Sequence, residues 1–345
     1  MRVCTWAPTV FQGPQLVGGS ATSAQPMPRG DALTGMARAM VQRYEALGLT
    51  DLLIAQRWWG SGVETEGSSL DALAMTSFFA SCTERLNLVT AIHPGFFTPT
   101  AIAKWGATLD TLTAGRWSIN VTSGWNLQEF DMYGIDALDH DARYRRAGEF
   151  IEVVRGAWDA RGPFDYSGDF YAANALRLAP TPAGELQVFQ GGQSDAAIAM
   201  AGRHSDWMFL NGGRDERVAD IVTRARSAAA THGRRLRFAL YAAPLCRPTD
   251  AEAWAEIDTR LAQLDPALVE RRKALVGGAE GMWGDADDPL SHLDTNEGYA
   301  ARLIGSPASI LERIDALQSL GIDMLHLDLR DELFVAEVLP ALIAR

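Results

Sequence analysis

Short apolar runs rich in β-branched and aromatic residues recur along the chain, and longer segments with helical periodicity separate them. Runs of four to ten such residues are typical of strands buried on both faces. The pattern predicts eight strands, over residues 3–8, 51–55, 86–91, 117–122, 186–191, 206–211, 237–246 and 324–329.

The intervening segments have the periodicity of amphipathic helices, most clearly over 31–47, 99–113 and 140–159. In the segment 99–113, residues Ile102, Trp105, Leu109 and Leu112 recur at spacings of three and four and so share one face. Strict alternation of strands and helices predicts parallel strands with crossover helices. Eight such units in 345 residues predict a (β/α)8 barrel as a single domain over 1–345, and a doubly wound sheet is the second choice.

Three connections are longer than a minimal barrel requires, over residues 56–69, 123–139 and 265–303. They follow the second, fourth and seventh strands, so they are expected at the C-terminal face, where barrel enzymes place their active sites. The third is rich in Gly and Asp and is expected to form a mobile loop. Long loops at that face suggest a lid over a pocket.

Composition excludes several classes of protein. The net charge of −12 argues against a nucleic-acid partner, and no apolar run is long enough for a membrane span. The three cysteines are far apart, the six histidines are dispersed, and no metal site is predicted. The N-terminus lacks the features of a signal peptide, so a cytoplasmic protein is the simplest expectation.

Two glycine-rich or basic segments indicate a phosphate site. The segment GGQSDAA, from Gly191 to Ala197, joins a strand to a helix, and Gly191, Gly192, Gln193 and Ser194 stand where backbone amides are free. The segment DHDARYRR opens another helix and places His140 and Tyr144 on one face. The glycine segment alone favours a phosphate over a plain helix cap, whereas the second segment alone favours an ordinary capped and solvated helix start. Together they predict a two-sided clamp on a phosphate.

The strand 117–122 ends in polar residues rather than in a neutral turn. Asn120 and Thr122 alternate toward the barrel interior, where buried polar groups need partners. A ligand with several heteroatoms would supply them, and hydrogen bonds to neighbouring strands or to buried water are the alternative. Aromatic residues also crowd the predicted strand ends, which suits a flat organic ligand: Trp6, Trp58, Trp59, Phe96, Phe97 and Trp125.

With these segments in order, the chain resembles the bacterial luciferase-like flavin-dependent monooxygenases, above all the alkanesulfonate, dimethyl sulfone and pyrimidine (RutA-type) branch. The resemblance rests on ATLDTLTAGRWSINVTSGWN, LDHDARYRRAGEFIEVVRGAWD, FDYSGDFY, FQGGQSDAAIAMAGRHSDWMFL and ARLIGSPASILERIDALQSLGIDMLHLDL. It implies a barrel that binds reduced FMN and a separate NAD(P)H:flavin reductase that supplies the flavin. It also implies that a flavin (hydro)peroxide oxygenates a small organic substrate with O2, and it suggests a homodimer or homotetramer.

Carried over by position, Asn120 and Thr122 would face the flavin ring, His140 and Tyr144 would reach its phosphate, and the segment from Gly191 to Ser194 would cradle that phosphate. The chain departs from the sulfonate-cleaving relatives at several positions. Tyr241 and Ala243 stand where they have an Arg-x-His pair, and His93 replaces an arginine. Arg57 and Arg302 are the remaining candidates for an anion.

These departures favour a less charged substrate, such as an aromatic or heterocyclic one, and they leave C4a and N5 oxygenation both open. Asn120, His93, Tyr241 and Arg57 are the expected catalytic residues. Three alternatives stay open: an F420-dependent oxidoreductase on the same barrel, a non-catalytic flavin-binding protein, and an unrelated phosphate-ligand barrel. The last is disfavoured because neither lysine, Lys104 or Lys273, lies on a predicted strand.

Overall fold

Eight parallel strands close into a barrel in the computed structural model of the chain, which describes residues 1–11, 16–17, 27–58, 68–276 and 287–345. Each predicted strand overlaps one of them, so the expected (β/α)8 barrel is confirmed. In barrel order the strands are β1 (Arg2–Trp6), β14 (Met324–Leu327), β11 (Arg237–Ala242), β10 (Trp207–Leu210), β9 (Gln187–Gly191), β6 (Trp117–Val121), β5 (Asn87–Ile92) and β3 (Asp51–Ile54).

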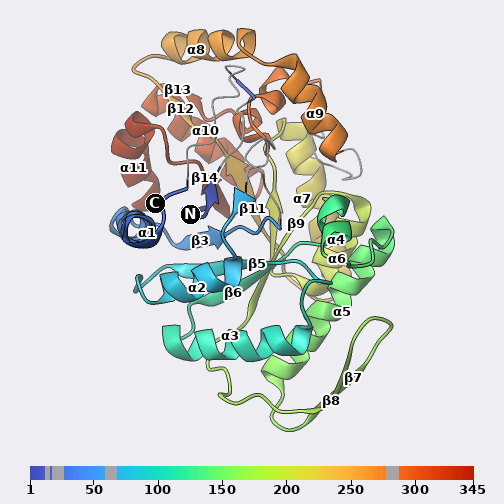
Figure 1. Cartoon of the computed structure of the whole chain (residues 1–345). Helices are drawn as coiled ribbons and strands as arrows, with labels where there is room; N and C mark the ends of the chain where they lie inside the picture. Colours follow the sequence, from blue (N-terminus) through green and yellow to red (C-terminus); the bar gives the residue numbers. More distant parts are fainter. Residues whose placement is uncertain (12–15, 18–26, 59–67, 277–286) are drawn as a thin grey trace.

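Helices surround this barrel in Figure 1. Their ends follow local capping signals: α3 starts with Pro99 in its first turn and stops at Ala114, which takes the left-handed conformation at φ 52°. The surrounding helices are α1 (Gly30–Ala46), α2 (Ala72–Ala80), α3 (Pro99–Thr113), α5 (His140–Asp159), α6 (Asp195–His204), α7 (Asp215–Thr231), α10 (Pro307–Ser319) and α11 (Leu339–Ile343).

Alternation along each strand divides the core into two layers. Outward side chains such as Leu325 and Leu327 pack under the helices, whereas Cys4, Phe189 and Met324 point into the barrel. The inward and outward sets each bury apolar surface, which is why the strands carry near-continuous apolar runs.

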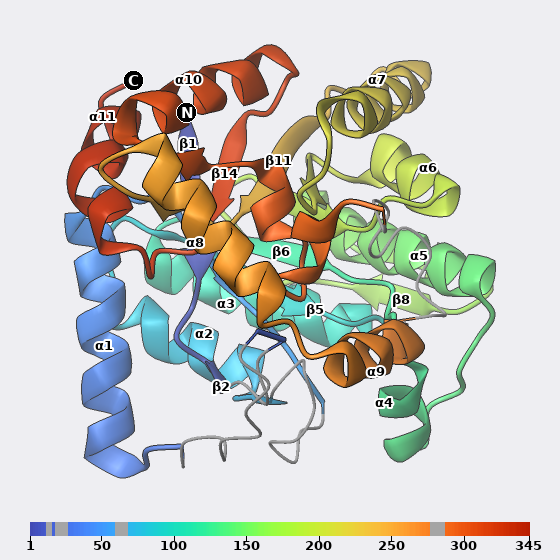
Figure 2. The same ribbon diagram turned by 90° about the horizontal axis from the view of Figure 1, so that it is seen from above.

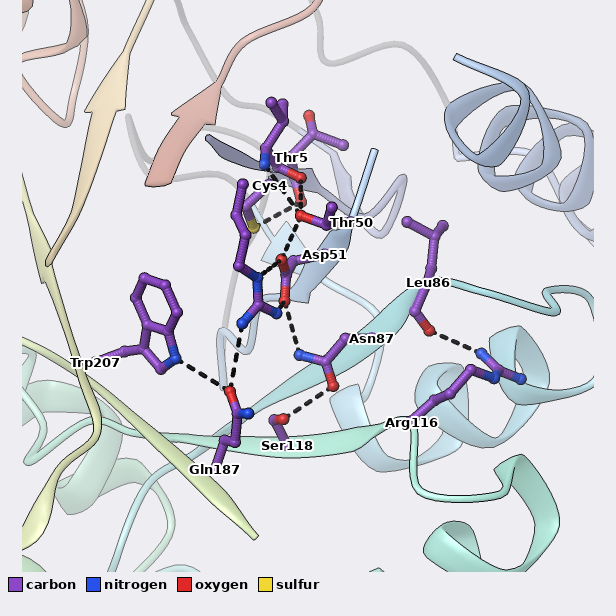
Figure 3. A network of polar contacts seen from close by, with 12 residues as sticks. Cys4, Thr5, Thr50, Asp51, Leu86, Asn87, Arg116, Ser118, Gln187 and Trp207 are labelled. Atoms are coloured by element: carbon purple, nitrogen blue, oxygen red, sulfur yellow. Dashed lines mark hydrogen bonds and ion pairs between the residues drawn. The ribbon is translucent and has the colours of Figure 1, made fainter. Parts of the chain in front are cut away.

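The N-terminal end of the barrel is closed by the polar network of Figure 3. Asp51 is fully buried and accepts hydrogen bonds from Arg2 Nε at 2.9 Å and from Asn87 Nδ2 at 2.7 Å. Gln187 accepts from Trp207 Nε1 at 3.1 Å, and Arg2 also lies over the Trp207 ring. We call the side chains of Arg2, Asp51, Asn87, Ser118, Gln187 and Trp207 the barrel floor.

Other elements extend the barrel. The hairpin of β7 (Phe164–Ser167) and β8 (Ala172–Leu176), which the sequence did not predict, projects away from the barrel in Figure 1. Two further small sheets pair β2 (Val10–Phe11) with β4 (Ser68–Ser69) and β12 (Leu245–Cys246) with β13 (Ile304–Gly305). The predicted strand 237–246 is thus two strands, because Cys246 pairs with Gly305 rather than with the barrel.

The connection 265–303 contains α9 (Pro266–Val276), η1 (Pro289–His292) and η2 (Gly298–Ala301). The Gly- and Asp-rich stretch expected to form a mobile loop begins with residues 277–286, which lie outside the described part of the chain, so that expectation stays a prediction. Figure 2 shows α9 and α8 (Asp250–Ala262) on the near side of the barrel. The short helix α4 (Leu127–Met132) lies in the second long connection, and the π-helical turn η3 (Phe334–Val338) precedes α11. None of the helices in the described part of the chain combines the length and apolar character needed to cross a membrane.

Candidate functional site

One pocket opens where the long connections meet the C-terminal ends of the strands. Nine of the residues expected from the sequence line it: Arg57, Asn120, Thr122, His140, Tyr144, Gly191, Gly192, Gln193 and Tyr241. They come from four strand ends and from the first turn of α5, which the barrel brings together although they are far apart in sequence.

The outer half of the pocket is cationic and lies at two helix starts. Asp139 caps α5, since its Oδ1 accepts a hydrogen bond from the Ala142 amide at 2.7 Å, and this places His140, Arg143 and Tyr144 at the pocket. Arg143 is 4% exposed, and its Nε has no partner among the described residues. Burial lowers the pKa of the Arg143 guanidinium, which nevertheless stays protonated in proteins.

The glycine segment faces this cationic end. Gly192 has φ +118°, and a Cβ atom there would lie only 2.8 Å from Tyr144 Oη, so the position requires glycine. Ser194 does not line the pocket. Its Oγ caps α6 by accepting from the Ala197 amide at 3.3 Å, and it lies 3.5 Å from His140 Nε2. A helix start, a left-handed glycine and a buried guanidinium suit a phosphate.

Asn120 lines the pocket from the end of β6. It is 7% exposed, and its Oδ1 is buried without a hydrogen-bond partner among the described residues. Ser123 Oγ, also in the pocket wall, is buried and unpartnered in the same part of the chain. Buried polar atoms are nearly always paired, so these two acceptors fit a polar ligand edge such as that of a flavin.

His93, like Ser194, is an expected site residue that does not line the pocket. It is 4% exposed, and its Nδ1 accepts a hydrogen bond from Trp58 Nε1 at 2.9 Å. Trp58 in turn stacks on Phe96 at 4.1 Å between ring centroids, so the Trp58 indole links His93 to Phe96. Burial lowers the pKa of His93 to about 3, and the imidazole is therefore neutral.

Of the two arginines expected to meet an anion, one lines the pocket and the other does not. The Arg57 guanidinium packs over Trp125 at 5.8 Å in the pocket wall. Arg302 donates to the buried Asp288 at 2.6 Å and does not line the pocket. Arg57 is thus the one of the two that a ligand in the pocket would meet.

Several lining residues were not predicted as site residues. His326, Phe209 and Asn211 come from strands β14 and β10 or the residue after them, and Asn296 comes from the third long connection. Asp294 holds the Asn296 segment, because its Oδ1 accepts from the amides of Asn296 at 3.1 Å and Gly298 at 2.8 Å. Burial raises the pKa of Asp294 to about 7.

Among the described residues, no group of three His, Cys, Asp or Glu side chains is arranged to hold a metal ion. The three cysteines are buried and unpaired. The side chains that line the pocket are therefore hydrogen-bonding, cationic and aromatic groups rather than metal ligands.

Comparisons with known proteins bear on this pocket. The chain is 36% identical over 315 residues to an FMNH2-dependent dimethylsulfone monooxygenase of Pseudomonas fluorescens (strain Pf0-1), covering 88% of this chain and 85% of that protein. It is 27% identical over 312 residues to the pyrimidine monooxygenase RutA of Enterobacter sp. (strain 638), covering 87% and 84%.

The fold is also found in solved structures. The EDTA monooxygenase of Chelativorans sp. BNC1 superposes with a TM-score of 0.80 at 21% identity, over 100% of this chain and 94% of that one. The family model for luciferase-like monooxygenases matches residues 1–324, which is most of the chain. This protein belongs to the luciferase-like monooxygenase family.

Proposed function

We propose that this protein is a two-component monooxygenase that takes up reduced FMN and uses O2 to oxygenate a small organic substrate. The observation that carries the assignment of the cofactor is the pocket itself. Its lining combines a cationic group of residues at two helix starts, the unpartnered Oδ1 of Asn120, and a group of aromatic side chains. A flavin mononucleotide offers a matching part to each: a phosphate, a polar ring edge and a flat ring.

The residues have distinct roles in this proposal. His140, Arg143 and Tyr144 bind the phosphate together with the amides of the segment from Gly191 to Gln193. Ser194 fixes the start of α6 and orients His140 from 3.5 Å. Asn120 and Thr122 hold the polar edge of the ring, and Arg57 and Tyr241 lie on the substrate side. His93 acts through Trp58 and is a positioning residue.

When bound, reduced flavin supplies the two electrons with which one atom of O2 enters the substrate while the other leaves as water. The protein holds the ring and the substrate together and excludes water, and the aromatic wall of Trp6, Phe209 and Tyr241 serves that exclusion. His326, in the same wall, is neutral at neutral pH because burial lowers its pKa to about 3.

We further infer that a separate NAD(P)H:flavin reductase delivers the cofactor. The relative from Pseudomonas fluorescens is named for its dependence on FMNH2, which is a flavin that is already reduced. A cytoplasmic location and a homodimer or homotetramer remain expectations from the sequence.

The test is an anaerobic titration of the protein with reduced FMN and, separately, with reduced F420, followed by tryptophan fluorescence. We expect micromolar binding of reduced FMN and much weaker binding of F420. Turnover under 18O2 with an added flavin reductase should then place one 18O atom in the product, as read by mass spectrometry. Tighter binding of F420 would favour the oxidoreductase alternative, and binding of FMN with no 18O in any product of a substrate panel would favour a non-catalytic flavin-binding protein.

A further inference from the structure

The inner half of the pocket is an aromatic chamber formed by Trp6, Phe209, Tyr241 and His326. The strand order places β14 between β1 and β11, with β10 next, so His326 has aromatic neighbours on several sides. Its ring centroid lies 4.3 Å from Trp6, 5.2 Å from Tyr241 and 5.5 Å from Phe209. Tyr241 and His326 are direct partners in the strand register.

Packing alone does not explain a histidine at this position. His326 is 2% exposed, and its Nε2 has no hydrogen-bond partner among the described residues. A buried polar atom without a partner costs about 1–3 kcal/mol, which an apolar side chain of similar size would avoid. The inward residue two positions earlier, Met324, is such a side chain. The unused hydrogen-bonding capacity of His326 therefore points to a ligand.

The imidazole is neutral in this environment. Burial lowers the pKa of His326 to about 3. A neutral imidazole carries one N–H donor and one acceptor nitrogen, so it can donate a single hydrogen bond to an oxygen without offering a positive charge.

The four chamber residues also carry no charge of their own. The charged groups that act on Tyr241 are Asp294, Asp328 and Arg330, and Arg330 Nε donates to Asp328 Oδ2 at 2.7 Å. Arg143 belongs to the other, phosphate-binding half of the pocket. Arg57 also lines the pocket, but its guanidinium packs over Trp125 at 5.8 Å, and Trp125 is not one of the four chamber residues. An anion placed against His326 would lose its hydration beside four uncharged side chains, which is strongly unfavourable.

We propose that the chamber selects a small uncharged substrate that carries an acceptor oxygen, as in a sulfone, a sulfoxide or a ring carbonyl, and that His326 donates a hydrogen bond to that oxygen. His326 is thereby the residue that fixes specificity for neutral over anionic substrates. This inference rests on the function proposed above, because it assigns the substrate end of the same pocket.

Two probes of nearly equal size separate the charge states. Dimethyl sulfone is neutral and methanesulfonate is anionic, and each gives one methyl proton signal, so both can be observed in one NMR sample. The protein is held with reduced FMN under anaerobic conditions, so that no turnover occurs. Saturation transfer from the protein should reach dimethyl sulfone and not methanesulfonate. Equal transfer to both compounds, or transfer to neither, would overturn the proposed substrate class.

Substitutions of His326 test the hydrogen bond. We expect His326→Phe to weaken sulfone binding at least tenfold while the dissociation constant of reduced FMN stays within twofold. His326→Gln, which restores an N–H donor, should recover part of the binding. His232→Phe, at an exposed histidine, is the matched control and should change neither value.

The readouts separate the two proposals. Failure of the wild-type protein to bind reduced FMN would contradict the proposed function. Retention of sulfone binding in His326→Phe, with reduced FMN bound, would instead remove His326 from substrate recognition and leave the monooxygenase assignment standing. In turnover, the same variant should raise KM for the neutral substrate more than it lowers kcat.

Discussion

The two ends of the barrel interior differ in whether their buried polar groups have hydrogen-bond partners. At the barrel floor, each of the six polar or aromatic side chains hydrogen-bonds to at least one of the others, and the fully buried Asp51 accepts from both Arg2 and Asn87. At the other end, Asn120 Oδ1, Ser123 Oγ and His326 Nε2 are buried without partners among the described residues.

This difference separates groups that stabilise the fold from groups that await a ligand. A satisfied network rigidifies the protein, and a partly satisfied one costs free energy unless something else completes it. Changes at the floor should therefore alter stability and spare ligand binding, and changes at the pocket should do the reverse.

The largest expected effect is on stability, from Asp51→Asn at the floor. The substitution leaves the Arg2 guanidinium without its carboxylate, which should lower the free energy of unfolding by about 3 kcal/mol. Urea denaturation followed by tryptophan fluorescence measures the change. The control is Asp315→Asn, which breaks the exposed ion pair with Arg345 and should cost less than about 1 kcal/mol. An equal loss in both variants would show that the floor network does not contribute in this way.

The opposite behaviour is expected of Asn120→Ala. Its Oδ1 has no protein partner among the described residues, so removing the amide should change the free energy of unfolding by less than about 1 kcal/mol. Turnover should fall about 100-fold, the effect typical of losing one oriented polar group in an active site. Steady-state rates with saturating reduced flavin and denaturation of the same sample measure both. A variant that loses stability but keeps its rate would reverse the assignment.

Much of the fold could be predicted because its determinants are local. The apolar runs gave all eight strands, and capping residues gave the predicted helix 99–113 its observed ends. The family match confirms the luciferase-like monooxygenase that these segments resemble. The hairpin of Phe164–Ser167 and Ala172–Leu176 was missed, because short exposed strands carry little apolar signal.

Site residues could be predicted from the sequence where they stand at strand ends or at the helix starts that follow. They could not be predicted where contacts with residues elsewhere in the chain decide their position. Asn120 and Tyr144 lie in the pocket because the ends of parallel strands and the following helix starts meet at one face. His326 carried a usable signal, since it is a polar residue in phase with the inward Met324, but it lies alone in the sequence. His93 was expected in the pocket, but it is buried outside it and its Nδ1 accepts a hydrogen bond from the Trp58 indole. Asn296 depends on Asp294 and has no local signal.

A smaller effect, on cofactor affinity, is expected of Tyr144→Phe at the phosphate end. Loss of one hydroxyl hydrogen bond should weaken binding of reduced FMN about tenfold, equivalent to about 1.4 kcal/mol. Tyr166→Phe is the control, since the Tyr166 hydroxyl donates to Glu152 at 2.7 Å and does not line the pocket. Anaerobic fluorescence titration compares the two. Equal dissociation constants would exclude the Tyr144 hydroxyl from the phosphate site.

The last expected effect is a change in how stability depends on pH. The folded protein keeps His326 neutral with a pKa of about 3, whereas an unfolded histidine titrates near 6.5. Between these values the unfolded chain binds more protons, so His326 makes the free energy of unfolding fall as pH falls through this window. The contribution approaches about 1.4 kcal/mol per pH unit well below 6.5. His326→Gln removes this contribution alone, since carboxylates and the other histidines are common to both proteins. Urea midpoints at pH 7.5 and at pH 5 should therefore differ less in His326→Gln than in the wild type. An identical pH dependence would mean that His326 exchanges protons with solvent in the folded state, and the chamber would then not be the dry, neutral site that its substrate selectivity requires.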